Sequence, residues 1–141
     1  FTFIPDYSIS IAQAMYEGSD IWLNTPIQPR EASGTSGEKS ALNGGLNCSI
    51  LDGWWAEMFD GRNGWAIATS DVVDPAGRDR EESAATFDVL DLILEEYHND
   101  PTAFVARIRH AWKSLGPRVN AARMVNEYRR QIDMPALSRV R

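Results

Sequence analysis

A run of small residues at 31–45, with the sequence EASGTSGEKSALNGG, constrains the fold more than any other part of this chain. Thr35 and Ser36 belong to the residue types preferred at helix N-caps, and the glycine pair 44–45 is typical of a helix end. The run therefore predicts a glycine-rich turn that opens a helix over residues 35–43. Such a helix start presents unpaired backbone N–H groups and the positive end of the helix dipole, which together favour an anion such as phosphate.

Lys39 stands four residues after Thr35, one helical turn further on and on the same face. A phosphate bound at the helix start would lie about the width of one small ring from the lysine amine. This layout is expected for pyridoxal phosphate, with its phosphate at the helix end and its aldehyde on the lysine. Taken alone, Lys39 could equally be an ordinary solvent-exposed lysine, the commonest environment for this residue type.

Elsewhere the chain alternates between strand-like and helix-like patterns and then becomes helical. Strands are predicted at 1–4, 20–23, 46–51 and 65–68, and helices at 9–17, 35–43 and 53–60. Helices are further predicted at 83–98, 101–115 and 119–132 after a polar hinge at 71–80, with Pro135 ending the last one. The alternation indicates parallel βαβ units, whose ligands collect at the carboxyl ends of the strands. We therefore expect an α/β segment over 1–75 and a helical tail over 76–141.

Composition excludes several classes of protein. The chain has 141 residues, a length that is sufficient for one domain. Its net charge of −6 disfavours general nucleic-acid binding. Residues 101–141 hold nine Lys/Arg against two acids, and the favoured partner of this basic tail is the acidic stretch 79–100 of the same chain. One cysteine, Cys48, allows no internal disulfide, and no apolar run reaches the roughly 20 residues that span a bilayer. A cytoplasmic protein is expected.

Other polar residues give weaker indications. His98 and His110 have no cysteine or carboxylate at ligand spacing, so no metal site is expected. Asp52, Glu57 and Asp60 could be paired acids for glycoside hydrolysis, but their spacing favours a solvated helix face.

Three tryptophans, Trp54, Trp55 and Trp65, could stack on sugar rings, although a place in the core is favoured. The serines at 33, 36 and 40 lack a neighbouring histidine, which makes a nucleophilic serine improbable.

Three stretches resemble a known family: DIWLNTP at 20–26, EASGTSGEKSALNGGLN at 31–47 and ILDGWWAEM at 50–58. They are similar to the C-terminal domain of the glycogen/α-glucan phosphorylases, in particular the bacterial type with a Trp-Trp pair after LDG. The resemblance is strong up to about residue 70 and weak afterwards. It implies the C-terminal part of a Rossmann-like, GT-B type glycosyltransferase lobe with a helical tail. Because the chain begins at Phe1 without an initiator Met, a fragment of a longer protein is expected.

The resemblance implies roles for the glycine-rich turn. Lys39 would be the catalytic residue and carry pyridoxal phosphate as a Schiff base. Thr35, Ser36 and Gly37 would hold the cofactor phosphate, and Tyr7 would line the cofactor pocket. The implied reaction is phosphorolysis of terminal α-1,4-glucosyl units of glycogen or maltodextrin to glucose 1-phosphate, with the cofactor phosphate acting beside the substrate phosphate.

Sugar contacts are implied just before the turn. Glu31 would accept hydrogen bonds from glucosyl hydroxyls, as ionised carboxylates do well, unless it serves only as an acid near a helix start. Ala32, Ser33 and Gly34 would add backbone contacts. The expected partners are α-glucan and inorganic phosphate, with a homodimer of the full-length protein left open. The isolated fragment is expected to be inactive, because the family's phosphate-binding basic residues lie upstream.

Two rival interpretations remain open. One is a nucleotide-sugar glycosyltransferase without pyridoxal phosphate, in which the same helix start holds a diphosphate and Lys39 is dispensable. The other is a non-catalytic glucan-binding remnant, which is favoured by Glu38 because the family usually has Met at that position.

Overall fold

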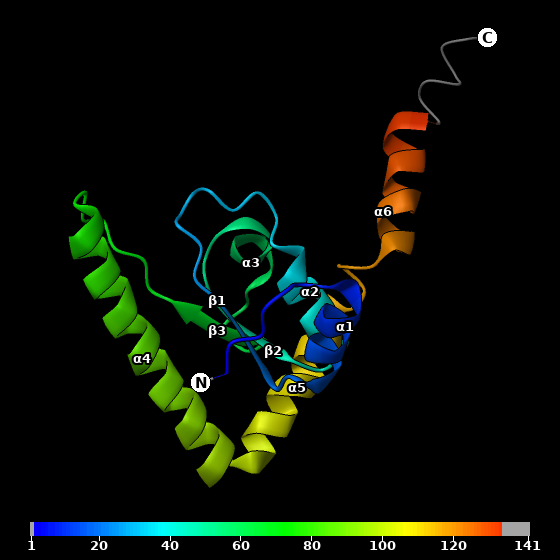
Figure 1. Cartoon of the computed structure of the whole chain (residues 1–141). Coiled ribbons are helices and arrows are strands. Elements are labelled where there is room, and N and C mark those ends of the chain that lie inside the picture. Colours follow the sequence, from blue (N-terminus) through cyan, green and yellow to red (C-terminus); the bar gives the residue numbers. More distant parts are fainter. Residues whose placement is uncertain (1, 134–141) are drawn as a thin grey trace.

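The computed structural model describes residues 2–133. Its elements, in chain order, are α1 (Ile9–Gly18), β1 (Ile21–Asn24), α2 (Thr35–Leu42), β2 (Leu46–Ile50), α3 (Gly53–Met58), β3 (Gly64–Ile67), α4 (Pro75–Asn99), α5 (Pro101–Leu115), α6 (Ala121–Tyr128) and the π-helical turn η1 (Arg129–Asp133). The strands form one sheet in the order β1-β2-β3 (Figure 1). None of the described helices is long and apolar enough to cross a membrane.

Both strand pairs are parallel, so the predicted βαβ alternation is confirmed. β1 pairs with β2 from Ile21↔Leu46 onwards, and β2 pairs with β3 from Asn47↔Gly64 onwards. Helix α2 connects the first pair and α3 connects the second. The carboxyl ends of all three strands therefore lie at the same edge of the sheet, the edge from which the loop to α2 departs.

Hydrophobic clusters hold helices against both faces of this sheet. On one face, Cys48, Ile50 and Ile67 pack against Ile93 of α4. A second cluster joins α2, α3 and α5 to the start of β2 and contains Ala41, Leu46, Trp54, Trp55, Phe104, Ala111 and Leu115. Trp54 and Trp55 are 6% and 0% exposed, which confirms that they belong to the core.

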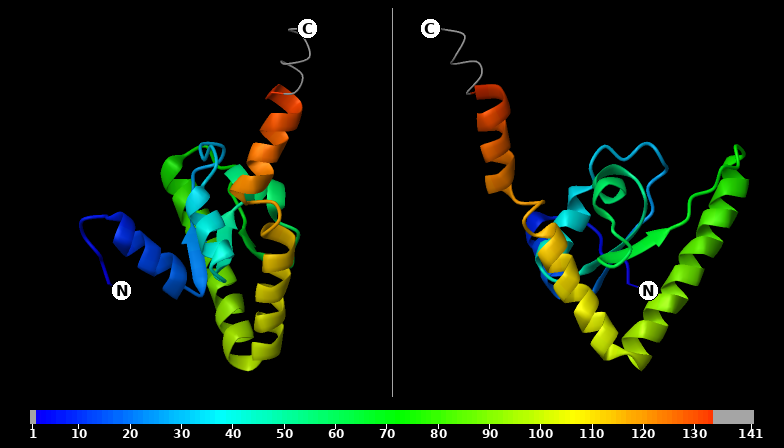
Figure 2. Two further views of the ribbon diagram at one scale, coloured as in Figure 1. Left: turned by 90° about the vertical axis from the view of Figure 1, so that its right-hand side faces the viewer. Right: turned by 180° about the vertical axis from the view of Figure 1, so that it is seen from behind.

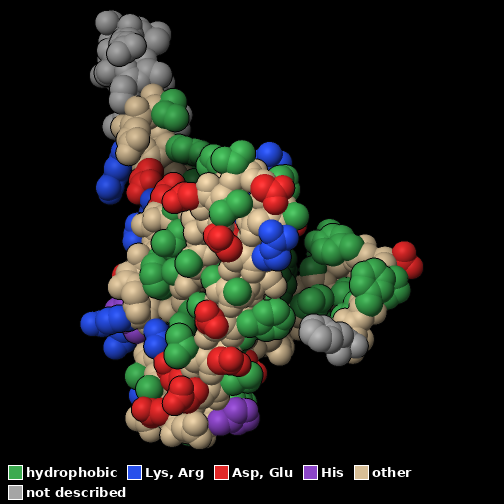
Figure 3. Space-filling model, turned by 90° about the vertical axis from the view of Figure 1, so that its left-hand side faces the viewer, with side chains coloured by type: hydrophobic (Ala, Val, Ile, Leu, Met, Phe, Trp, Pro, Cys, Tyr) green, Lys and Arg blue, Asp and Glu red, His purple; other side chains and the backbone are tan. Residues whose placement is uncertain are grey.

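The helices α4 and α5 meet at Asp100 and open into a V, with the sheet packed between its arms (Figures 1 and 2). Arg107 of α5 forms an ion pair with Glu96 of α4 at 2.6 Å and lies over the Trp65 ring, 4.4 Å from its centroid. This pair confirms that the basic tail contacts the acidic stretch of the same chain. Other acidic side chains remain exposed among hydrophobic ones on the α4 face (Figure 3).

Helix α4 begins earlier than the predicted helix at 83–98, so the expected polar hinge at 71–80 is partly helical. The Asp74 side chain accepts a hydrogen bond from the Gly77 N–H at 2.8 Å, and Pro75 stands in the first turn. An aspartate cap followed by proline is a strong helix start, which outweighs the polar composition of this stretch. The division into units at residue 75 stays a prediction.

The strand predicted at 1–4 is wrong for its described residues, which lie in coil with Phe3 87% and Ile4 50% exposed. A strand is stabilised by hydrogen bonds to a neighbour, and residues 2–4 pair with none of the described strands.

The last predicted helix, 119–132, is divided into α6 and η1, and Pro135 lies outside the described residues. Asn120 caps α6 by accepting a hydrogen bond from the Arg123 N–H at 2.9 Å. None of the residues of α6 is buried, and the helix projects away from the sheet (Figures 1 and 2).

Candidate functional site

The start of α2 forms the candidate site, and its N-cap is Gly34 rather than Thr35 or Ser36 as expected. Gly34 has φ of 83°, a left-handed conformation that glycine adopts without strain. A Cβ at this position would also come within 3.4 Å of Glu31 Cγ and Trp54 Cδ1. Thr35 and Ser36 are thus the first two helical residues, and their N–H groups are helix-start donors without a partner in the helix.

The indole of Trp54 lies directly beneath this turn. A Cβ on Gly37 would be 3.0 Å from Trp54 Cζ2, and the backbone N–H of Trp54 donates a hydrogen bond to the Ser33 carbonyl at 2.9 Å. From the other side, the Trp22 indole N–H donates to the Ser36 hydroxyl oxygen at 3.2 Å. The two indoles therefore hold the turn from both sides. Only glycine fits at 37, because a Cβ there would meet Asn47 Oδ1 at 2.6 Å as well as the Trp54 indole.

Lys39 is exposed in the second turn of α2, on the same face as the exposed Thr35. Its Nζ lies 5.7 Å from the centroid of the Tyr16 ring of α1, and no ion pair within residues 2–133 involves it. Burial raises the pKa of the neighbouring Glu38 carboxyl, an effect that the charges of Lys39 and Arg123 reduce without reversing. An accessible amine thus stands one turn from two unpaired N–H donors, which fits a ligand carrying both an aldehyde and a phosphate.

The loop at 31–33 is anchored to the start of α3. Asp52 is 9% exposed; its Oδ2 accepts the Glu31 N–H and its Oδ1 accepts the Gly53 N–H, both at 2.9 Å. Ala32 and Ser33 between these contacts are exposed. The interpretation of Asp52 as part of a solvated face is wrong. Its position directly before a glycine and an apolar helix is the signal of an N-cap that sequence reasoning missed.

Comparison with known proteins gives the family of this chain. Residues 1–64 match the family model described as carbohydrate phosphorylase, and the chain is 48% identical over 95% of its length to the glycogen phosphorylase of Mycobacterium tuberculosis. The chain belongs to the carbohydrate phosphorylase family. It is also 39% identical over 89% of its length to the glycogen phosphorylase of Aquifex aeolicus, and 38% identical over 87% to the maltodextrin phosphorylase of Thermococcus litoralis.

This member of the carbohydrate phosphorylase family spans only 16%, 19% and 15% of the length of those three relatives, respectively. No solved structure matches it.

Tyr7 is the one predicted site residue of this phosphorylase chain that lies far from the glycine-rich turn in sequence. It is 79% exposed on the coil before α1, so it has little contact with any described element. Its place in a cofactor pocket stays a prediction.

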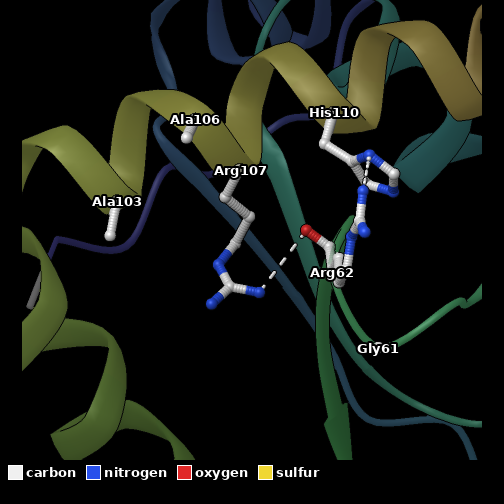
Figure 4. A pocket seen from close by; sticks show the side chains of 6 residues that line it. All are labelled: Gly61, Arg62, Ala103, Ala106, Arg107 and His110. Atoms are coloured by element: carbon white, nitrogen blue, oxygen red, sulfur yellow. Dashed lines mark hydrogen bonds between the residues drawn. The ribbon is translucent and has the colours of Figure 1, made fainter.

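A separate polar cluster lies at the opposite edge of the sheet, on the turn before β3 (Figure 4). His110 Nε2 lies 2.7 Å from Asp60 Oδ2, and its Nδ1 lies 2.9 Å from Arg62 Nη2. Burial raises the pKa of Asp60, but hydrogen bonds from His110 and from the Arg62 and Asn63 N–H groups outweigh burial and hold that pKa below its usual value. Asp60 is thus engaged by His110, while Asp52 caps α3.

Sequence spacing could not reveal the His110 contact, since Asp60 and His110 are 50 positions apart. Within the described part of the chain, no group of three or more His, Cys, Asp or Glu side chains is arranged to hold a metal ion. The expectation of no metal stays a prediction.

Proposed function

We propose that this chain is the cofactor-bearing part of an α-glucan phosphorylase and forms part of a GT-B type lobe. The observation that carries the proposal is the position of Lys39 on α2, one turn after the N–H groups of Thr35 and Ser36, which have no backbone partner among the described residues. Relatives that match most of the chain are named glycogen or maltodextrin phosphorylase, which supports α-glucan and inorganic phosphate as the substrates.

The start of α2 would bind the phosphate of pyridoxal phosphate. The N–H groups of Thr35, Ser36 and Gly37 belong to the first turn, where the helix dipole favours a dianion. Lys39 would hold the cofactor covalently through Nζ and so keep it one helical turn from those donors. When bound, the cofactor supplies a phosphate group that exchanges a proton or stabilises charge beside the substrate phosphate.

The loop at 31–34 would bind the terminal glucosyl unit. Glu31 is partly exposed while its backbone N–H is held by Asp52, so its carboxylate can accept hydrogen bonds from a polyol without losing its anchor. Ala32, Ser33 and Gly34 would contribute backbone groups to the same sugar. Anchoring of the loop reduces the entropy that sugar binding would otherwise cost.

The test uses the full-length protein that contains this chain. Its absorbance is recorded with pyridoxal phosphate, the protein is reduced with borohydride, and the modified peptide is identified by mass. The chain has two lysines, Lys39 and Lys113, both exposed and helical, so Lys113 is a matched control. We expect an adduct on Lys39 alone. Lys39→Ala should abolish glucose 1-phosphate release from glucan and phosphate, whereas Lys113→Ala should retain it.

Absence of an adduct from the full-length protein would overturn the proposal. Activity retained in Lys39→Ala would overturn it too, and a cofactor-free glycosyltransferase that uses a nucleotide sugar would then be favoured. Glucan affinity without any cofactor absorbance would instead indicate a non-catalytic remnant.

A further inference from the structure

Asn47 is a buried amide that core packing does not explain. It lies on the middle strand β2, is 1% exposed, and stands between the fully buried apolar residues Leu46 and Cys48. Among the described residues, neither its Nδ2 nor its Oδ1 has a hydrogen-bond partner. Buried polar side chains are paired in the great majority of cases, and an unpaired amide in a core costs stability. An apolar side chain here would suit the core better.

The amide lies against the first turn of α2. A Cβ built on Gly37 would be 2.6 Å from Asn47 Oδ1, nearer than any other neighbouring atom, and 3.0 Å from the indole of Trp54. Asn47 pairs in the sheet with Trp22, whose indole N–H donates to the Ser36 hydroxyl. Side chains of β1, β2 and α3 therefore meet at the turn that presents the helix-start N–H groups.

We propose that Asn47 is a positioning residue for the phosphate site at the start of α2. Gly37 has no side chain to fill the space between α2 and β2, so the planar amide of Asn47 sets how closely the first turn of α2 approaches the sheet. A change at 47 would displace the N–H donors of Thr35 and Ser36, which belong to the same turn. The inference rests on the proposed function, because it assigns a role toward the cofactor phosphate of that same site.

The test compares Asn47→Leu and Asn47→Ala with the unaltered full-length protein. Release of pyridoxal phosphate is followed in the presence of hydroxylamine, and the cofactor phosphate is observed by its ³¹P resonance. We expect release to be faster by about tenfold to a hundredfold, as the loss of one hydrogen bond to a charged group produces, together with a shifted ³¹P resonance. The melting temperature of the cofactor-depleted protein should stay unchanged or rise in Asn47→Leu, because an unpaired amide is removed.

Ser40→Ala is the matched control. The Ser40 hydroxyl is also fully buried on α2 and unpaired among the described residues, but it faces Gly45 at the other end of the helix. This variant should leave both the release rate and the ³¹P resonance unchanged. A comparable effect of Ser40→Ala would mean that any polar loss beneath α2 acts alike, and the specific role of Asn47 would be refuted.

Release at the normal rate with a lowered melting temperature would show that Asn47 only packs, and would overturn the inference. Should the Asn47→Leu protein fail to fold, Gly37→Ala is tested alone and combined with Asn47→Ala. Alanine at 47 leaves space for the new Cβ at 37. The double variant should therefore release the cofactor more slowly than the sum of the two single-variant effects predicts. Additive effects would refute the contact.

The outcomes also separate the two proposals. An unaltered protein without an adduct on Lys39 refutes the proposed function and this inference together. An unaltered protein that holds the cofactor, with Asn47 variants that hold it equally well, refutes the inference alone.

Discussion

Replacing Asp52 by alanine removes one carboxylate that holds two parts of the site together. Its Oδ1 caps α3 through the Gly53 N–H, and its Oδ2 accepts the Glu31 N–H, both at 2.9 Å. Loss of the cap costs about 1 kcal/mol, and the part-buried Glu31 N–H left without a partner costs about 1–2 kcal/mol. The expected loss in free energy of unfolding is therefore about 2–3 kcal/mol.

Thermal unfolding of the 141-residue chain, followed by far-UV circular dichroism, measures this loss. At about 3 °C per kcal/mol for a chain of this size, Asp52→Ala should melt about 6–9 °C lower. Asp52→Asn keeps one acceptor oxygen and should lose about half as much. For the proposed phosphorylase activity of the full-length protein, the freed loop should raise the KM for glucan more than it lowers kcat, because a binding contact rather than the reacting group is perturbed.

Two results would refute this reasoning. A loss below about 0.5 kcal/mol in Asp52→Ala would be that of an ordinary surface substitution and would show that the carboxylate anchors nothing. Equal losses in the alanine and asparagine variants would show that the hydrogen-bond acceptors do not determine the effect.

Three further predictions concern other parts of the chain. Burial raises the pKa of the Cys48 thiol to about 12, so an aromatic disulfide reagent should label Cys48 only after unfolding; native labelling at the rate of a free thiol would contradict this. Burial also raises the pKa of Glu38 above its ordinary value of 4.5, despite the opposing charges of Lys39 and Arg123. The stability linked to the Glu38 proton is therefore full below that ordinary pKa and is lost as pH rises through the folded pKa. Glu38→Gln should therefore raise the melting temperature near pH 7 and not near pH 3, and equal gains at both pH values would exclude this cause. Arg107→Lys breaks a bidentate contact to Glu96 and a stacking contact on Trp65, and should lower the free energy of unfolding by about 1–2 kcal/mol. Arg123→Lys, in the exposed pair with Glu127, should lower it by under about 0.5 kcal/mol. Urea unfolding measures both losses.

Local signals predicted those elements whose limits depend on nearby residues. Ser8 caps α1 by accepting the Ile11 N–H at 3.2 Å, as its position before an apolar helical pattern predicts. The predicted helix at 101–115 is confirmed because Asp100 caps it and Pro101 opens it. The strand predicted at 1–4 failed because pairing with another strand is not encoded in the four residues themselves.

The candidate site shows the same division between local and long-range information. The spacing of Thr35 and Lys39 follows from helix geometry alone and could be predicted from sequence. The choice of Gly34 as the cap could not, because four consecutive residues, 33–36, are all acceptable cap types. The packing of Trp54, twenty positions further on, against a glycine that needs a left-handed φ decides it.

The residues proposed to supply chemistry and the residues that surround them in the fold are therefore distinct sets. Thr35 and Lys39 are exposed on one helix face and would have the same spacing in any α-helix. The glycine-rich turn itself lies against Trp22, Asn47 and Trp54, which come from two strands and another helix. Because an isolated helix of eight residues is marginal in water, the proposed phosphate site can form only when β1, β2 and α3 pack against α2. Cofactor binding should consequently stabilise the sheet together with α2 rather than α2 alone, since ligand binding stabilises every part of the cooperative unit that must fold to create the site.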